Sequence, residues 1–364
     1  MKLRELAPSW IFLVIPLLLA GLACGGADRA GSEAAESVET AKSEALTPDG
    51  EAALHARATQ RFFPLPEAAP NPENPVTQAK VELGRRLYVD PRLSAAGTIS
   101  CNSCHDLATY GVDNLPTSPG DQGQLGDRNS PTVFNAALHL AQFWDGRAAD
   151  VEEQAGMPIL NPVEMAIASD EALIGRLAAV EGYPEAFAQA FPEDDPALTY
   201  GNIARALGAF ERTLLTPAPF DDYLAGDLDA IDAEAKRGLD TFMSLGCSAC
   251  HNGYTMGGYS FRKFGLHGDY WVHTGSQKVD DGRFAVTGAE EDRYVFKVAA
   301  LRNVEKTAPY FHDGSVATLE EALRVMGAVQ LERELTDDEV SALAAFLRTL
   351  TGEPPASALA TAGP

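Results

Sequence analysis

The chain has 364 residues, a formal net charge of −24 at pH 7 and only five cysteines. Such an acidic chain has no general affinity for nucleic acid, and its charge either favours basic partners through long-range attraction or simply keeps the protein soluble. A chain of this length can form two domains of ordinary size, each with its own hydrophobic core.

The first residues have the layout of a bacterial export signal. Lys2 and Arg4 precede an apolar run over residues 10–20, and small residues follow it. Residues 1–23 are therefore predicted to be an export signal peptide, which places the mature protein in the periplasm. Cys24 stands where a lipoprotein signal has its acylated cysteine, so we expect a lipid anchor there. The alternative is ordinary cleavage near Ala23, which leaves Cys24 as a free thiol.

Residues 24–56 are rich in Ala, Glu, Ser and Gly and have little other apolar content. This composition is typical of a flexible, solvated tether, and no fold is predicted there. The leader is the only apolar run of nearly 20 residues in the sequence, so we expect no internal membrane span. Contact with a membrane would depend on the lipid anchor alone.

Two copies of Cys-x-x-Cys-His, at residues 101–105 and 247–251, are the most specific feature of the chain. In a c-type cytochrome the two thiols bind the vinyl groups of a haem and the imidazole binds its iron. Zinc sites would need further cysteines near each pair, and only Cys24 is left over. We therefore predict two covalent c-type haems, attached through Cys101, Cys104 and His105 and through Cys247, Cys250 and His251.

Helical patterns surround both motifs. Residues 79–87 and 235–242 precede the two motifs and resemble each other, each with an apolar stripe and a glycine that would let another helix approach closely. Apolar residues at helical spacing predict further helices over residues 203–214 and 336–350, and the last of these begins with capping-box spacing. The fold class is therefore predicted to be mainly α, with long connecting loops.

The domain boundary is placed just after the helix that ends at Thr216-Pro217. Residues 57–216 are predicted to form an N-terminal haem domain and residues 217–352 a C-terminal haem domain. Residues 353–364 are small and rich in Pro and Ala, which predicts a disordered tail.

The second haem has one methionine that is well placed to close its far face. Met243 and Met256 flank the motif too closely to cross the ring, whereas Met326 lies far enough along the chain from His251 to return over it. Met/His ligation raises the reduction potential, so this haem would accept electrons and bind no substrate.

The first haem has no comparably placed ligand. His139 lies in an apolar stretch that is typical of a packed structural histidine, and Met157 and Met165 stand beside polar residues that suit a reaction pocket. An open or water-bound iron is therefore our hypothesis for the first haem.

With these residues in view, residues 64–352 closely resemble the bacterial dihaem cytochrome c peroxidases. The resemblance is carried by long and unusual strings at residues 111–117, 129–133, 141–148, 301–304 and 307–312. It implies two cytochrome c-like domains whose haems face a shared interface, a structural calcium ion, a homodimer, and the two-electron reduction of hydrogen peroxide to water. The electrons would come from a small carrier cytochrome c or a cupredoxin.

The resemblance also implies how electrons travel. His105 would be the proximal ligand of a low-potential peroxidatic haem, and His251 and Met326 would ligate the high-potential haem that receives electrons. Trp144 would lie between the haems as the electron bridge, although a buried aromatic side chain that fills a domain interface is an equally ordinary role for tryptophan. His312 would support a propionate or the calcium loop.

The peroxide pocket and the calcium site follow from the same resemblance. Glu164 and Gln154 would line the pocket, because a carboxylate with a raised pKa can take a proton from one peroxide oxygen and return it to the other, while a neutral amide orients the peroxide. Without the resemblance, Glu164 would be interpreted as a surface carboxylate and Gln154 as a helix residue. Asn129, Thr307 and Pro309 would bind calcium, the last two through main-chain oxygens.

One position departs from the family. In most members the loop between residues 117 and 129 carries a histidine that closes the peroxidatic iron in the resting oxidised enzyme, and here the matching residue is Asp121. A carboxylate is a poor substitute for imidazole on a low-spin haem. We therefore expect the first haem to be high-spin and accessible to peroxide without prior reduction.

Two alternatives remain open from the sequence. A related subgroup matures methylamine dehydrogenase by modifying protein side chains and also lacks the loop histidine, but its members place tyrosine on the second haem, where this chain has Met326. A dihaem electron carrier with no chemistry of its own would need both irons to be six-coordinate, and the apparent lack of a sixth ligand on the first haem weighs against it.

Overall fold

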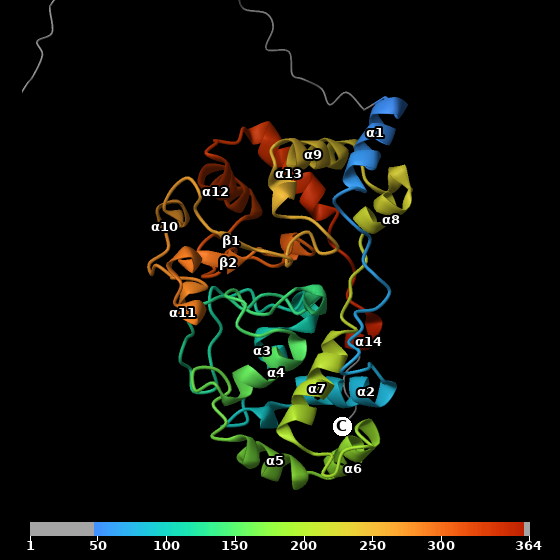
Figure 1. The fold of residues 1–364 in the computed structure, drawn as a ribbon, viewed down its shortest axis with the longest axis vertical. Coiled ribbons are helices and arrows are strands. Elements are labelled where there is room, and N and C mark those ends of the chain that lie inside the picture. The colour runs from blue at the N-terminus through green and yellow to red at the C-terminus, as the bar shows by residue number, and fades with distance from the viewer. Residues whose placement is uncertain (1–46, 360–364) are drawn as a thin grey trace, which may run out of the picture. The chain divides into compact units, whose positions relative to one another are not determined.

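The computed structural model describes residues 47–359, and its regular structure is almost entirely helical (Figure 1). Within this range the helices are α1 (Pro48–Ala58), α2 (Gln78–Tyr88), α3 (Cys101–Cys104), α4 (Val151–Leu160), α5 (Asp170–Ala178), α6 (Tyr183–Ala190), α7 (Tyr200–Glu211), α8 (Pro219–Ala225), α9 (Ala233–Ser244), α10 (Tyr270–Thr274), α11 (Phe284–Thr287), α12 (Leu319–Leu331), α13 (Asp337–Arg348) and α14 (Ala356–Leu359). Two short strands, β1 (Phe261–Lys263) and β2 (Val295–Lys297), pair antiparallel in the same described range. The predicted mainly α class is confirmed. None of the helices in this range is long and apolar enough to cross a membrane.

The buried apolar side chains of residues 47–359 gather in two clusters. The first core lies around α2 and α7 and consists mainly of residues 83–214, and the second core lies around α9 and α13 and consists mainly of residues 220–350. Figure 1 shows these two helix pairs well separated from each other. Cys101 packs against the first core and Cys247 against the second, so each core carries one of the two motifs.

The two helix pairs cross in the same way. A Cβ atom built on Gly84 of α2 would lie 2.0 Å from the carbonyl oxygen of Ala206 on α7, and one built on Gly238 of α9 would lie 1.9 Å from that of Ala342 on α13. Both distances are far inside van der Waals contact, so each crossing requires glycine. The predicted internal repeat is therefore confirmed as a repeated helix packing.

The helices α2, α9, α7 and α13 lie close to their predicted positions. α13 begins with the expected capping box, in which the Thr336 N–H donates to the Glu339 carboxylate at 2.9 Å and the Glu339 N–H donates to the Thr336 hydroxyl at 3.3 Å. α7 ends at Glu211, earlier than its apolar stripe predicted, although Leu214 is still fully buried in the first core.

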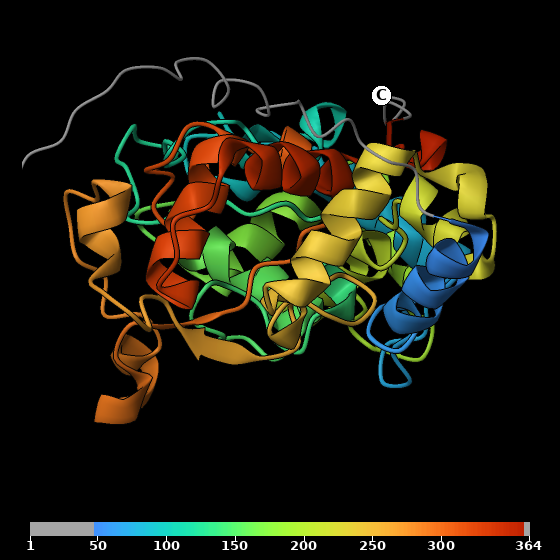
Figure 2. The same ribbon diagram turned by 90° about the horizontal axis from the view of Figure 1, so that it is seen from above.

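The two ends of the described chain differ from the prediction. The tether was expected to reach residue 56, but α1 starts at Pro48 and buries Leu54, Ala58 and the following Phe62 in the second core. Figures 1 and 2 show α1 beside α8. In sequence α1 is nearer to the first motif, but it packs against the core of the second. The apolar stripe of α1 is short, and the alanine-rich composition of the surrounding residues led to the prediction of a tether.

The expected disordered tail also contains structure. α14 (Ala356–Leu359) lies within it, and Ala358 is buried against the first core. The predicted limits of the haem domains, 57–216 and 217–352, therefore omit a segment of the chain from each core. Residues 1–23 and Cys24 lie outside the described residues, so the predicted leader and lipid anchor stay predictions.

Replacing Gly238 by alanine should destabilise the protein. The new methyl group would collide with the backbone of α13, and forcing extra atoms into a packed interior costs about 1–3 kcal/mol. Gly175→Ala is the matched control, because a Cβ atom at Gly175 of α5 meets nothing within 4 Å. The control should be neutral or stabilising by up to about 1 kcal/mol, since alanine favours a helix. Thermal unfolding of both holoprotein variants checks this, and equal stability of the two would contradict the packing argument.

Candidate functional site

The first motif forms a single helical turn. Cys101 and Cys104 are the ends of α3, and residues three apart lie on the same side of a turn, so the two thiols point the same way. His105 follows directly, and its carbonyl oxygen accepts a hydrogen bond from the Tyr88 hydroxyl at 2.7 Å. Burial lowers the pKa of His105, which keeps the imidazole in the neutral form that binds metals.

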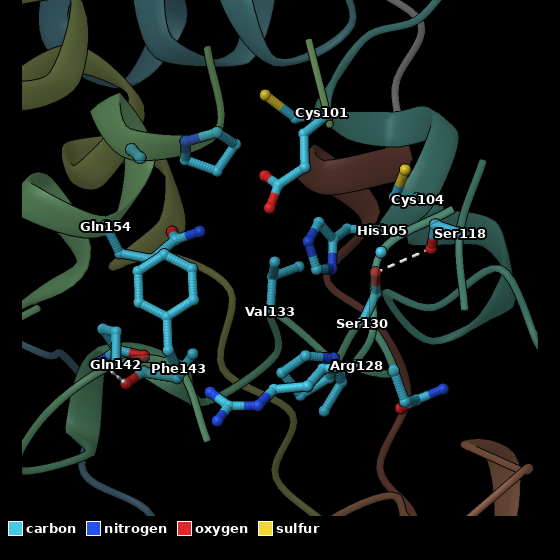
Figure 3. Close-up of a pocket in the computed structure, with 18 of the residues that line it drawn as sticks. Cys101, Cys104, His105, Ser118, Arg128, Ser130, Val133, Gln142, Phe143 and Gln154 are labelled. Atoms are coloured by element: carbon cyan, nitrogen blue, oxygen red, sulfur yellow. Dashed lines mark hydrogen bonds between the residues drawn. The ribbon is translucent and has the colours of Figure 1, made fainter. Parts of the chain in front are cut away.

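These three side chains line a cavity with about 1350 Å³ of space free of protein atoms, part of it open to solvent. In Figure 3, Cys101 and Cys104 lie at one end, His105 projects into the middle and Arg128 lies at the opposite end. Much of the wall is apolar and includes Val133, Phe143, Ala155 and Met165. Two thiols, a neutral imidazole and an apolar wall fit a covalent c-type haem.

Gln154 and Glu164 line the same cavity as His105. Gln154 projects from α4, and Glu164 lies in the turn that follows this helix. One Glu164 oxygen accepts a hydrogen bond from the Asn161 amide at 2.9 Å. Burial raises the pKa of Glu164, although Arg147 and Asn161 oppose this effect. The carboxyl group is therefore a cavity residue that gains a proton more readily than a carboxyl group on the surface.

The three side chains that we considered as sixth ligands for the first haem lie in different surroundings. Met165 is buried and lines the cavity, whereas the Met157 side chain is 39% exposed on α4. His139 lines the cavity and its Nδ1 lies 3.2 Å from the Lys297 ammonium nitrogen. This contact agrees with the interpretation of His139 as a packed histidine.

Trp144 lies where the two cores meet. Its indole N–H donates to the carbonyl oxygen of Asn129 at 2.9 Å, and its own carbonyl oxygen accepts from the Lys297 N–H of β2 at 2.8 Å. The side chain lines the first cavity and also packs against the second core. Trp144 is therefore in contact with the surroundings of both motifs, which suits an electron bridge as well as an interface filler.

The second motif has a different environment. Cys247 begins a short 3-10 turn (Cys247–Ala249), and Cys250 and His251 follow. Nδ1 of His251 lies 3.2 Å from the carbonyl oxygen of Met256, so this nitrogen can donate a hydrogen bond and leave Nε2 for a metal. The main chain at Met256 thus lies on the Nδ1 side of the ring.

Met326 projects from α12 and packs against the second core, as do Cys247 and Met243. The aromatic ring of Phe242 lies edge-on to the His251 ring, with 6.4 Å between their centres. A second haem attached to Cys247 and Cys250 would therefore be surrounded by aromatic and thioether side chains. This environment suits a haem whose faces are closed by protein ligands.

The predicted calcium ligands come from two loops that the structure joins. The Asn129 N–H donates to the carbonyl oxygen of His312 at 2.7 Å, and the Asn114 amide donates to the carbonyl oxygen of Ala308 at 2.8 Å. Within residues 47–359, no group of three or more His, Cys, Asp or Glu side chains is arranged to hold a metal. A calcium ion at Asn129, Thr307 and Pro309 would therefore depend on amide, carbonyl and water oxygens, which are acceptable calcium ligands.

Asp121 anchors the wall of the first cavity. Its carboxylate accepts hydrogen bonds from the hydroxyl groups of Ser94 and Thr98, both at 2.7 Å, and its N–H donates to the carbonyl oxygen of Glu164 at 2.8 Å. Burial alone would raise the pKa of Asp121, but the hydrogen bonds from Ala96, Thr98 and Ser94 outweigh it and lower the pKa. The ionised side chain thus fastens its loop to residues 94–98, and the main-chain N–H of Asp121 fastens the loop to the turn that carries Glu164.

Charged cavity residues were missed by the sequence analysis. Glu211 projects from the last turn of α7, and burial raises its pKa to about 8. Lys297 reaches the cavity from β2, and Arg128 reaches it from the loop before Asn129. The available signal was a charged residue inside an apolar pattern, since Glu211 follows Phe210 and Lys297 interrupts an apolar strand.

A helical fold with two cores, each carrying a Cys-x-x-Cys-His motif, defines a dihaem protein of the c type. The sequence matches the family model described as di-haem cytochrome c peroxidase over residues 78–229. It is 47% identical to the cytochrome c551 peroxidase of Pseudomonas aeruginosa over 309 residues, which cover 83% of this chain and 88% of that protein.

Two further comparisons agree with this family match. The chain is 37% identical to the methylamine utilization protein MauG of Methylorubrum extorquens, across 95% of this chain and 98% of that protein. The crystal structure of a MauG-like protein associated with microbial copper homeostasis superposes with a TM-score of 0.72 at 30% identity, covering 82% of this chain and 95% of that one. The chain belongs to the di-haem cytochrome c peroxidase family, and membership implies two c-type haems.

Replacing Asp121 by alanine should destabilise the protein by about 1–3 kcal/mol, because several buried donors lose their acceptor. The folded-state pKa of Asp121 lies below its unfolded value of about 4, so this stabilisation is present at neutral pH and disappears as the pH falls through the folded-state pKa. Denaturant unfolding of the holoprotein as a function of pH measures it.

The matched control is Asp127→Ala in the same loop, where the carboxylate is 69% exposed and pairs with Lys278. Its effect should be within about 1 kcal/mol. A loss for Asp121→Ala that equals the control, or that persists unchanged in acid, would contradict the anchoring role.

Proposed function

We propose that the protein reduces hydrogen peroxide to water with electrons from a small carrier cytochrome c or a cupredoxin. The observation that carries this proposal is the cavity at the first motif, in which His105, Gln154 and Glu164 line one space. His105 would bind the iron of the first haem, and the far face of this haem would stay open to peroxide. The relatives that are named cytochrome c551 peroxidase and that share most of this chain support the same activity.

The reaction consumes one peroxide molecule, two protons and two electrons and forms two water molecules. The haem, when bound, supplies the iron centre at which the oxygen–oxygen bond is cleaved. Glu164 accepts the proton from the peroxide oxygen nearer the iron and returns it to the departing oxygen. Its raised pKa suits both steps, because the protonated and ionised forms are then closer in free energy. The Gln154 amide orients the peroxide without competing for the proton.

Electrons would enter at the second motif. His251 and Met326 would ligate the second haem, and the Met/His pair would give it the higher potential. Trp144 would pass electrons to the first haem, since its side chain lines the first cavity and packs on the second core. A calcium ion at Asn129, Thr307 and Pro309 would hold together the two loops on either side of this path.

The predicted leader over residues 1–23 supports a periplasmic protein, where c-type haems are attached and peroxide from outside the cell arrives. Acylation of Cys24 would tether it to a membrane through the segment that precedes α1. The net charge of −24 favours a basic electron donor. We further propose a homodimer, as in the family.

The first haem should be accessible in the fully oxidised protein. The Asp121 carboxylate is committed to Ser94 and Thr98, so it is held away from the role of an iron ligand. EPR of the resting protein should therefore show one high-spin and one low-spin ferric haem, and cyanide should bind without prior reduction. Two low-spin signals, one of them bis-histidine, would defeat this expectation.

Glu164→Gln should lower kcat/KM for hydrogen peroxide by roughly 10²–10⁴-fold, because the amide can neither take nor return the proton. The assay follows oxidation of a reduced carrier cytochrome in steady state, starting from both the oxidised and the half-reduced enzyme. Wild-type protein should be active from both states.

Glu193→Gln is the control, since Glu193 is exposed and the substitution removes the same charge. It should leave kcat/KM unchanged. Equal rates for Glu164→Gln and wild type would remove Glu164 from the mechanism. Slow oxidation of the carrier together with long-lived storage of two oxidising equivalents would instead favour a MauG-type activity, which the 37% identical relative makes the second candidate.

A further inference from the structure

Lys297 belongs to one core but reaches the cavity of the other. It is the last residue of β2, where it pairs with Phe261 of β1, and β2 contributes to the second core. Its N–H donates to the carbonyl oxygen of Trp144 at 2.8 Å, and its side chain lines the cavity at the first motif. Only 9% of Lys297 is exposed, so the backbone and the burial together hold the side chain in place.

The ammonium group of Lys297 has no counter-charge among residues 47–359. The interaction found for its Nζ is with Nδ1 of His139 at 3.2 Å, and no carboxylate oxygen of the described residues lies within 4.0 Å of it. Asp145 is the carboxylate whose charge acts on Lys297, but it is already paired with Arg128 at 2.5 Å and with Arg147 at 3.0 Å.

An unpaired buried cation is costly, because it loses its hydration without gaining an opposite charge. This cost is reflected in the pKa of Lys297, which burial lowers to about 8, although Asp145 partly opposes the shift. Lys297, Arg128 and Arg147 all line the cavity. The groups that act on Lys297 are His139, at 3.2 Å, and the charge of Asp145, which both arginines already pair with. The cavity therefore has a cationic region with one cation left without an anion.

The position of Arg128 relative to the cysteines points to the anion. Figure 3 shows Cys101 at one end of the cavity and Arg128 at the other. A c-type haem is attached through its vinyl groups, and its two propionates leave the opposite edge of the porphyrin. A haem attached to Cys101 and Cys104 would therefore direct its carboxylates toward the cationic end.

We propose that Lys297 binds a propionate of the first haem and so makes the second core part of the binding site of the first haem. The inference rests on the haem site at residues 101–105 and not on the peroxidase activity. His139 is then a positioning residue, because its Nδ1 accepts from the ammonium group and directs it into the cavity. A positive charge next to a haem favours the reduced state, so Lys297 also raises the potential of the first haem.

The test is a spectroelectrochemical titration of the holoprotein, with the two haems followed separately. Lys297→Met keeps the length and apolar stem of the side chain and removes the charge. It should shift the potential of the first haem to lower values and change that of the second haem less. Lys297→Arg restores the charge and should recover most of the shift. Lys278→Met is the control, since Lys278 is 69% exposed and pairs with Asp127.

The proposal is overturned if Lys297→Met leaves the first potential unchanged, if it shifts both potentials equally, or if Lys278→Met has the same effect. Should Lys297→Met fail to take up haem, resonance Raman spectra of the wild type and Lys297→Arg decide, because the propionate bending modes of the first haem must differ between an ammonium and a guanidinium partner. Unchanged modes reject the contact. None of these measurements uses peroxide, so an inactive wild type would refute the proposed function and leave this test intact.

Discussion

The relation between the two cores depends on Arg128. Its guanidinium group donates to both oxygens of Asp280, at 2.7 and 2.9 Å, and to Asp145 at 2.5 Å. Asp145 follows Trp144 directly, and Asp280 belongs to the segment that leads into β2, so one side chain ties the interface tryptophan to the part of the chain around the second core. Buried ion pairs contribute specificity more than net stability. Here the ion pairs fix the position of Trp144, which lines the first cavity and packs against the second core.

The two motifs share their sequence pattern and their helix packing but differ in what surrounds them. The first faces a cavity that contains a carboxylate with a raised pKa, a neutral amide and several cations. The second faces the aromatic and thioether side chains of its own core, including Phe242 and Met326. Because the helix crossing is repeated, the difference between the two sites arises from side chains outside that crossing. Gln154 on α4 and Glu164 in the turn after it line the first cavity, whereas Met326 on α12 packs against the second core.

Sequence reasoning found what local patterns encode. The two motifs, the glycine crossings at Gly84 and Gly238, the capping box of α13 and the cavity residues Gln154 and Glu164 all follow from spacing or from the family resemblance. Lys297 and Glu211 were not predicted as cavity residues, because the surroundings of a buried charged side chain depend on residues that are far away in the chain. Asp121 was noticed only as a missing histidine, and its anchoring contacts with residues 94–98 needed the three-dimensional structure.

The chain ends bind the two cores into one structure. α1 and the turn that follows it supply Leu54, Ala58 and Phe62 to the second core, and α14 places Ala358 against the first. Burial of a large apolar side chain is worth about 1.5–3 kcal/mol, so Leu54 and Phe62 together carry several kcal/mol. That is comparable with the net stability of a whole domain, about 5–15 kcal/mol. Neither residues 57–216 nor residues 217–352 contain a complete core, so the two motifs belong to one folded body, in which Trp144 lines the first cavity and packs against the second core.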